Sequence, residues 1–280
     1  MRFDRLKVIV LTHGGAERVL ELLAGDSSVE IVGVFVETEV EKQRGLFEIF
    51  KRSIRYDGFA ATLRKILSKI AGRGEKVNED PSEGLAPRSS VRDTCDELKL
   101  QYHEVRNYHD PTSIDLIENA KADLGIVYGT NILKEPVFSL PRLGCLNIHQ
   151  GLAPKYRGGP TVFWELFNDE REIGITVHFV AAKVDTGDIV LQQTIPLAYD
   201  FAKYGTKVEN FLNDLRQTLK EPSARLMAEA VHLIATGKAQ PIKQDPGLGK
   251  RYRLPLKTEK DELVRRLIRR HKKQQGQTSR

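Results

Sequence analysis

The alternation of apolar strands and amphipathic helices at the start of the chain constrains its fold more than any other feature. Residues 7–11 form a short apolar run rich in β-branched side chains, and residues 29–36 form a second one. Between them, a glycine-containing turn at 13–15 leads into an amphipathic pattern over 19–23. A strand, a helix and a strand in this order favour a parallel pair with a right-handed crossover. The sequence therefore predicts an α/β fold: a Rossmann-like, mostly parallel twisted sheet flanked by helices.

The same alternation resumes after residue 90 and continues toward residue 200. Beyond residue 200 the pattern is mainly helical, over 208–219, 222–235 and 256–271. We therefore expect an α/β domain over 1–200 and a helical C-terminal extension with a basic tail over 201–280. Within the domain, the predicted segments are helix 93–100, strand 102–106, helix 111–120, strands 123–128 and 145–149, a helix opened by Gly159-Pro160, and strands 174–180 and 189–195.

Residues 40–90 interrupt the alternation. The charged stretch 41–69 carries an apolar stripe and is predicted to be helical, whereas 72–90 is rich in glycine, proline, serine and charged residues. Such a composition offers few apolar groups to offset the entropy lost on ordering, so we expect 72–90 to be a mobile loop.

Positive charge is concentrated near the C-terminus. The chain has a net charge of +6, whereas residues 250–280 alone contain 12 Lys or Arg against 3 Asp or Glu. The rest of the chain is therefore slightly acidic. Two interpretations remain: a solvated helix with a frayed end, or a contact with nucleic acid or another anionic surface.

The chain lacks the sequence features of membrane or secreted proteins. No apolar run has the length of a membrane span and no leader peptide is evident, so we expect a cytoplasmic protein. Cys95 and Cys145 are far apart in the sequence, and we expect both thiols to be reduced. They form no metal-ligand pattern, and we predict no metal site.

The residues with the clearest chemical potential follow the strand over 145–149. Asn147 and His149 are two positions apart, so they project from the same face of that strand. In an open α/β sheet, ligands bind at the carboxyl ends of the strands. An amide donor beside an imidazole can stabilise an oxyanion and relay a proton. A nearby carboxylate favours an imidazolium, and Asp185 lies in a turn signal over 184–187.

The alternative is that these side chains are structural. An Asn-x-His pair at a strand end is more often a hydrogen-bonded structural pair, and Asp185 in a separate motif is what favours catalysis. His178 lies in mid-strand between Val177 and Phe179, so we interpret it as structural.

These residues resemble the folate-dependent formyltransferase family, over roughly residues 6–200. That family includes glycinamide ribonucleotide, methionyl-tRNA and sugar N-formyltransferases and the formyltetrahydrofolate hydrolases. The resemblance rests on two motifs in the family's order and spacing: Asn147-Ile148-His149 followed by Leu152-Ala153-Pro154 and Arg157-Gly158, then Val177-His178-Phe179-Val180 followed by Asp185-Thr186-Gly187-Asp188.

The resemblance implies a role for each of Asn147, His149 and Asp185. It also implies that residues 1–200 form a formyltransferase catalytic domain. Asn147 would hold the formyl oxygen, and His149, as an imidazolium, would stabilise the tetrahedral oxyanion. Asp185 would favour that imidazolium and help to move a proton from the attacking amine to the leaving folate nitrogen. The donor would be 10-formyltetrahydrofolate, as co-substrate, and the attack would be direct.

The resemblance also implies where the two substrates bind. The pterin of the donor would lie near the 126–133 and 181–187 loops, against Ile126, Tyr128, Gly129, Leu133, Val184 and Gly187. The acceptor would contact the turn after the first strand and the loop after His149, at Gly14, Gly15, Arg157 and Gly158.

Departures from the family pattern bear on the acceptor. The loop Gln150-Gly-Leu-Ala-Pro154 replaces the more usual Ser-Leu-Leu-Pro type. A helical C-terminus disfavours a tRNA acceptor, which the basic tail keeps open, and the length of 40–90 disfavours the compact purine enzyme. No regulatory domain is expected before the first strand, which disfavours the hydrolase. By elimination, a small amine, an amino sugar or sugar nucleotide, is the expected acceptor. A hydrolase, a methionyl-tRNA enzyme and a non-catalytic binding module remain as alternatives, and the oligomeric state stays open.

Overall fold

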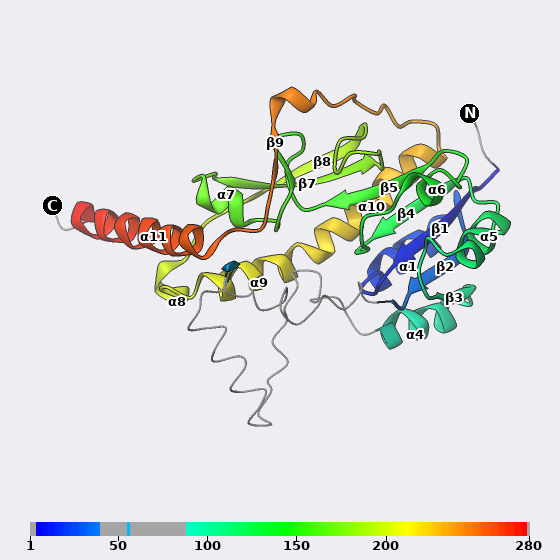
Figure 1. Ribbon diagram of the computed structural model, residues 1–280, viewed down its shortest axis with the longest axis horizontal. Coiled ribbons are helices and arrows are strands. Elements are labelled where there is room, and N and C mark those ends of the chain that lie inside the picture. Colours follow the sequence, from blue (N-terminus) through cyan, green and yellow to red (C-terminus); the bar gives the residue numbers. More distant parts are fainter. Residues whose placement is uncertain (1–3, 40–54, 57–87, 279–280) are drawn as a thin grey trace.

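The computed structural model describes residues 4–39, 55–56 and 88–278 (Figure 1). Within these residues, seven strands form one sheet in the order β3-β2-β1-β4-β5-β7-β8. Strands β1 to β5 pair in parallel, whereas β7 and β8 are antiparallel. The predicted α/β fold with a mostly parallel sheet is confirmed. The strands are β1 Leu6–Thr12, β2 Val29–Glu37, β3 Tyr102–Val105, β4 Leu124–Tyr128, β5 Cys145–His149, β7 Glu172–Phe179 and β8 Ile189–Pro196.

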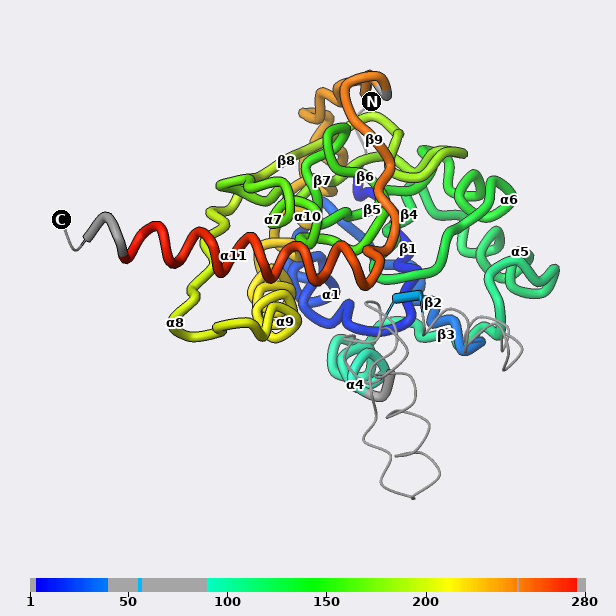
Figure 2. The backbone as a smooth tube through the Cα atoms, turned by 60° about the vertical axis from the view of Figure 1, so that its left-hand side comes forward, coloured from blue at the N-terminus to red at the C-terminus, as the bar shows by residue number. Residues whose placement is uncertain are grey.

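Helices cover both faces of the sheet (Figure 2). Alternate side chains of β1 face opposite layers: Val8 and Val10 pack with α1 and α10, whereas Ile9 and Leu11 pack with α5 and α6. Because both faces are covered, the central strands β1 and β4 are mostly apolar along their length. The helices are α1 Glu17–Ala24, α4 Arg88–Leu98, α5 Pro111–Asn119, α6 Glu135–Phe138, α7 Phe163–Phe167, α8 Phe201–Tyr204, α9 Val208–Thr218, α10 Lys220–Ala235 and α11 Lys257–Thr278.

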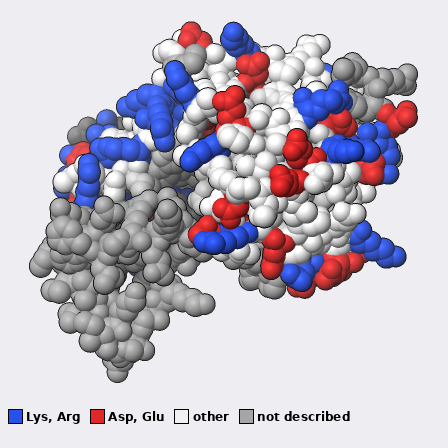
Figure 3. Space-filling model, turned by 45° about the vertical axis from the view of Figure 1, so that its right-hand side comes forward, with Lys and Arg blue, Asp and Glu red and all other residues white. Residues whose placement is uncertain are grey.

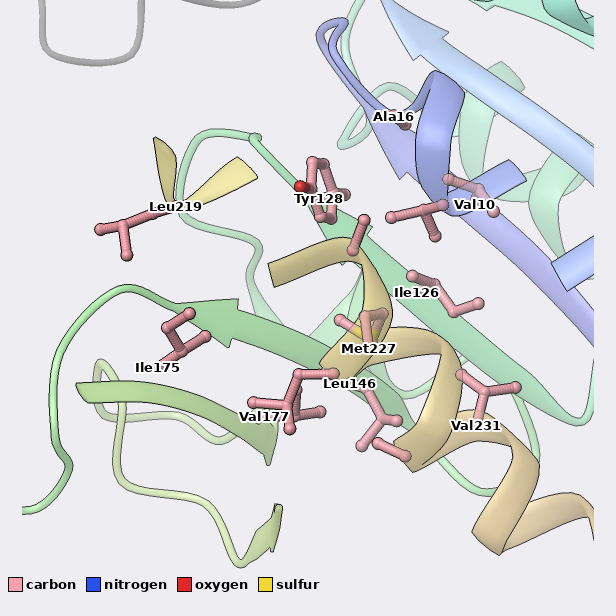
Figure 4. Close-up of a cluster of buried hydrophobic side chains, with 14 of the residues drawn as sticks. Val10, Ala16, Ile126, Tyr128, Leu146, Ile175, Val177, Leu219, Met227 and Val231 are labelled. Atoms are coloured by element: carbon pink, nitrogen blue, oxygen red, sulfur yellow. The ribbon is translucent and has the colours of Figure 1, made fainter. Parts of the chain in front are cut away.

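Helix α10 lies beyond residue 200 but packs directly on the sheet. Its Met227 and Val231 face Ile126, Leu146 and Val177 from three strands, and all five side chains are buried (Figure 4). The hydrophobic core therefore extends into 201–280, and the domain boundary at residue 200 stays a prediction.

A second, two-stranded sheet differs from the sequence prediction. Strands β6 (Tyr156–Gly158) and β9 (Lys250–Tyr252) pair in parallel. A helix was predicted to open at Gly159-Pro160, whereas α7 begins at Phe163, because Gly158 and Gly159 adopt left-handed φ values of 62° and 56°. Strands of three residues are too short for an alternating pattern to show, and this pair joins distant parts of the chain.

Two predicted segments fall largely outside the described residues. They are the helix over 41–69, of which only residues 55 and 56 are described and are helical, and the loop over 72–90, in which α4 already begins at Arg88. Within the part of the chain that the structure describes, no helix is both long and apolar enough to cross a membrane.

The packing of α10 on the sheet predicts a large effect of Leu146→Ala. Leu146 is fully buried, so we expect the free energy of unfolding to fall by about 2–5 kcal/mol. Leu248, which is 72% exposed, is the matched control, and Leu248→Ala should change that energy by less than about 0.5 kcal/mol. Urea denaturation followed by circular dichroism measures both, and equal losses in the two variants would contradict this packing.

Candidate active site

Strand register brings three polar side chains to one face of the sheet. Strands β5 and β7 run antiparallel, with Asn147 opposite His178, and Asn147 Nδ2 lies 3.4 Å from His178 Nε2. His149 is two residues further along β5 and projects from the same face. Both histidines are buried. All three side chains therefore meet at the carboxyl end of β5, beside β4.

Asp185 reaches this face from the turn between β7 and β8. Its backbone has a left-handed φ of 53°, which Asp tolerates in turns better than most residues. Its Oδ2 lies 3.5 Å from His149 Nδ1, and its Oδ1 lies 3.4 Å from His178 Nε2. The backbone N–H of Gly158 donates to Oδ2 at 2.8 Å. One buried carboxylate thus lies between two imidazoles and accepts from strand β6.

The surroundings keep Asp185 ionised. Burial acts to raise its pKa, because it removes the carboxylate from water. The charge of His149, the hydrogen bond from His178 and the backbone N–H of Gly158 outweigh burial, and they hold the pKa of Asp185 well below its ordinary value. The site therefore carries a fixed negative charge at neutral pH.

His149 has a protein partner at each ring nitrogen. Its Nε2 lies 2.9 Å from the carbonyl oxygen of Tyr156, and because a carbonyl only accepts, Nε2 carries a proton in this arrangement. Its Nδ1 faces Asp185. A proton on Nδ1 would therefore complete an ion pair with a carboxylate that is already ionised.

His178 has two competing partners at Nε2. Its Nδ1 lies 2.8 Å from the carbonyl oxygen of Phe179, which places a proton on Nδ1. When Nε2 is unprotonated, it accepts from the amide of Asn147; when Nε2 is protonated, it donates to Asp185. One proton therefore decides whether the Asn147 amide is bound by His178 or is released to another acceptor.

A small cavity borders His149 on the side of α7. Glu165 lies on its wall and is 3% exposed. Burial raises the pKa of Glu165 to about 7, although the backbone N–H groups of Glu165 and Val162 oppose the shift. The volume is about 10 Å³, comparable to one water molecule, and the lining includes His149, Gln150, Tyr156, Gly158, Thr161, Trp164 and Glu165.

Comparison with known proteins places this site in a family. The model of the formyl transferase family, described as Formyl transferase, matches residues 7–210. The chain belongs to this family. Among curated proteins, the methionyl-tRNA formyltransferase of Bacteroides fragilis is 32% identical over 177 residues, 63% of this chain and 49% of that protein. The chain spans about half the length of the curated relatives it matches.

Solved structures share the formyl transferase fold. Glycinamide ribonucleotide transformylase 1 from Symbiobacterium toebii gives a TM-score of 0.58 at 17% identity, over 86% of this chain and 96% of that chain. An N-formyltransferase from Helicobacter canadensis, solved with folinic acid and dTDP-3-aminofucose, gives 0.53 at 15% identity, over 89% and 71%. At these identities the likeness shows the fold alone.

The structure brings His178 into contact with the predicted site residues. Asn147, His149 and Asp185 come together as the sequence motifs require, but His178, interpreted as structural, contacts two of them. The sequence signal for His178 is the alternation over 175–178. Thr176 and His178 share one face of the strand, and the apolar Ile175 and Val177 share the other. Only the register of β5 against β7 shows that this face carries the site.

The residues predicted to bind the donor occupy two places. Their contact with a folate stays a prediction. Ile126 is fully buried in the core, Tyr128 and Leu133 are buried, and Gly129 leaves β4 with a left-handed φ of 66°. Val184 and Gly187 flank Asp185 in its turn.

The residues predicted to bind the acceptor also lie at two separate places in the fold. Gly14 and Gly15 follow β1. The backbone N–H of His13, just before them, donates to the carbonyl of Gly129. Arg157 is buried, and its guanidinium donates to the carbonyls of Pro154 and Gly249, while Gly158 binds Asp185. Arg157 and Gly158 thus support the loop, and their contact with an acceptor stays a prediction. Among the described residues, no cluster of His, Cys, Asp and Glu forms a metal site.

Asp185 predicts a pH-dependent stability difference. Because its folded-state pKa is lowered, its stabilisation is present above the unfolded-state value of about 3.9 and is lost as pH falls through the folded-state pKa. We expect Asp185→Asn to lower the free energy of unfolding at pH 7 by about 1–3 kcal/mol. The difference from the wild type should shrink as pH falls from about 4 toward 2. Denaturant titrations across this range measure it, and a difference independent of pH would contradict the ion pairing.

The raised pKa of Glu165 predicts a stability that falls as pH rises, opposite in sign to the effect of Asp185. Its pKa is raised to about 7, so the folded state binds more protons than the unfolded state and stability falls as pH rises from about 4.3 to 7. We expect Glu165→Gln to remove most of this decline. Thermal unfolding of both proteins at pH 5 and pH 8 tests this, and the same decline in the variant would rule out Glu165 as its source.

Proposed function

We propose that this chain transfers a formyl group from 10-formyltetrahydrofolate to the amino group of a small acceptor, an amino sugar or a sugar nucleotide. The observation that carries the proposal is the contact of Asp185 with His149 and His178, beside Asn147, in a member of the formyl transferase family. This cluster stands at the carboxyl edge of the sheet, where open α/β folds bind their ligands.

His149 is the group we assign to the developing oxyanion. In the protonated ring, one N–H faces Asp185 and the other faces the carbonyl of Tyr156. The bond to Tyr156 is the exchangeable one, because a neutral carbonyl holds an imidazolium less strongly than a carboxylate does. A formyl oxygen that takes the place of this carbonyl receives a hydrogen bond that strengthens as the oxygen becomes anionic.

Asn147 supplies the second donor to the same oxygen. When His178 is protonated at Nε2, that nitrogen donates to Asp185 and no longer accepts from the Asn147 amide. The Asn147 amide is then free to donate to the formyl oxygen. The amide and the imidazolium then act from one face of β5, two residues apart. Two donors fixed on a strand need little reorganisation as charge develops, which is the condition for effective oxyanion stabilisation.

Asp185 acts first through its charge and second as a proton relay. A carboxylate with a low pKa is a weak proton acceptor, so its larger contribution is to hold positive charge at His149. We also assign Asp185 a proton relay, through one bridging water, from the attacking amine to the leaving folate nitrogen. None of the four side chains is a hydroxyl or thiol nucleophile, which supports direct attack.

The carboxyl end of β4 suits a flat ring such as a pterin. Gly129 turns the chain there, and the loop that follows exposes Ile132 to 66% while Leu133 beside it is buried. An exposed apolar side chain next to accessible backbone groups is the combination that small-molecule sites use. The folinic acid in the Helicobacter canadensis enzyme supports a folate as the donor here.

The turn after β1 favours an acceptor without a phosphate at that position. His13 pairs with the carboxylate of Glu37, which is 3% exposed, and Glu17 lies in the first turn of α1. Helix N-termini attract anions, but the carboxylate of Glu17 in the first turn of α1 opposes a phosphate there. A sugar hydroxyl or amine meets no such repulsion.

A second candidate acceptor is methionyl-tRNA, which the named curated relative and the basic tail favour. Ion pairs weaken this acceptor only in part: three carboxylates of α11 and two of the body pair with basic side chains of the tail, which keeps an excess of positive charge. In Figure 3, acidic and basic side chains are interspersed over the right-hand part of the face, whereas basic side chains gather at its upper left. Strong, salt-sensitive binding of methionyl-tRNA would favour the tRNA acceptor. The ion pairs of the basic tail are Arg253–Glu259, Lys257–Asp261, Lys260–Glu209, Arg266–Glu262, Arg269–Glu262 and Arg270–Asp169.

The catalytic assignment predicts large, separate losses. Asn147→Ala, His149→Ala and Asp185→Asn should each lower turnover by about 10²–10⁴-fold, the range for a lost oxyanion donor or general acid. The matched control is His232→Ala, because His232 is 46% exposed and pairs with Asp26 on the surface. Release of tetrahydrofolate from 10-formyltetrahydrofolate, with and without a panel of amino sugars, measures the turnover.

The outcomes separate the alternatives. Amine-dependent release that the three variants lose and His232→Ala keeps supports the transferase. Release that does not depend on an amine would replace it with a hydrolase. Wild-type turnover in any of the three variants would remove that residue from the mechanism.

A further inference from the structure

The segment over 242–253 crosses the site at two places. It leaves α10, runs along the edge of β8, passes β6 and enters α11 (Figures 1 and 2). It lies beyond residues 7–210, which the family model matches, and outside every motif that identifies the catalytic residues. Its contacts nevertheless fall on the two loops that hold Asp185 and His149.

The first contact fixes the Asp185 turn. Ile242 and Ile189 exchange both backbone hydrogen bonds at 2.8 Å. Two residues on, Gln244 is 7% exposed and its Nε2 donates to the carbonyl of Gly187 at 2.6 Å. On its other side, a Cβ at Gly187 would lie 1.8 Å from the carbonyl oxygen of Phe179. The turn is therefore held between β7 and the Gln244 side chain.

The second contact fixes strand β6. In the register of β9 against β6, Tyr156 lies opposite Lys250 and Gly158 opposite Tyr252. Tyr156 provides the carbonyl that binds His149, and Gly158 provides the N–H that binds Asp185. The ring of Tyr252 stacks on that of Tyr156, with centroids 5.1 Å apart. Both backbone partners of the catalytic groups thus belong to a strand whose described sheet neighbour is β9.

The segment is anchored on both sides of these contacts. Upstream, α10 packs on the sheet. Downstream, the indole N–H of Trp164 donates to the carbonyl of Arg253 at 2.8 Å. Helix α11 then buries Leu263 and Leu267 in the core, and Arg266 donates to the carbonyl of Phe167 at 3.0 Å. A segment tethered at both ends can transmit its position to the loops it touches.

We propose that residues 242–253 position the catalytic site: Gln244 fixes the turn that carries Asp185, and Tyr252 fixes the strand that binds both Asp185 and His149. Both are positioning residues, since each acts through another group. The inference rests on the proposed function for its kinetic effect and on geometry alone for its effect on the imidazoles.

Substitution at Gln244 separates positioning from stability. Its Nε2 makes one hydrogen bond, and its Oε1 has no hydrogen-bond partner within the described residues. Gln244→Met keeps the volume and removes the unpaired Oε1, but it also leaves the carbonyl of Gly187 without this donor, so we expect a modest loss of stability and a folded protein. The turn would lose its tie to the segment, and small misplacements of catalytic groups lower rates by up to about 10²-fold.

The experiment uses the full chain and two readouts. Turnover and KM for the formyl transfer are measured for Gln244→Met, Tyr252→Ala and Tyr252→Phe, with Leu248→Ala, on the same segment but 72% exposed, as the matched control. The second readout is the titration of the His149 and His178 rings by ¹⁵N NMR, which requires no activity.

We expect kcat to fall by about tenfold or more in Gln244→Met and Tyr252→Ala, with KM nearly unchanged. The melting temperature should fall modestly in Gln244→Met and further in Tyr252→Ala, which loses a ring packed on Tyr156 and Trp164. Tyr252→Phe retains the stacked ring and should recover most of the rate, and Leu248→Ala should match the wild type. The titrations of His149 and His178 should shift in Gln244→Met and Tyr252→Ala, but not in Leu248→Ala.

Wild-type titrations and wild-type kcat in folded Gln244→Met and Tyr252→Ala would overturn the positioning role. If Tyr252→Ala does not fold, Gln244→Met alone decides. If the wild type transfers no formyl group, the proposed function fails, and the NMR readout still tests whether the segment sets the state of the imidazoles.

Discussion

The site depends on one buried charge, the carboxylate of Asp185. A buried carboxylate persists only if its neighbours replace the water it has lost. Here two imidazoles and a backbone N–H do so. Each of these partners comes from a different strand, β5, β7 and β6, so the charge draws together parts of the chain that are separate in sequence. The orientation of the His149 ring follows from that arrangement.

These three strands are held in the fold to different extents. Strands β5 and β7 lie in the main sheet, with α10 packed behind them, and their register is set by the core. Strand β6 has three residues and one described neighbour, β9. The candidate site therefore joins the main sheet to a short strand whose described sheet partner is β9, and that short strand carries the carbonyl of Tyr156 that His149 binds.

The sequence predicted the sheet and the family because both follow from local patterns. Alternating strands and helices, and the Asn147-x-His149 and Asp185 motifs, lie within short windows. The contacts of His178 and the strands β6 and β9 could not be predicted from the sequence for a common physical reason: they arise from pairing across the sheet or between distant parts of the chain. The face that His178 occupies depends on the β5–β7 register, and Gln244 and Tyr252 carry no motif at all. The domain boundary and the substrate-binding residues stay predictions.

The most direct test of the account is to follow the formyl carbon itself. The purified chain is incubated with 10-formyltetrahydrofolate labelled at the formyl carbon and with a panel of amino sugars, and the products are separated by mass spectrometry. The account predicts that the label leaves the folate and appears on the nitrogen of an amine. Label recovered only as formate, or retained on the folate with every amine, would contradict it.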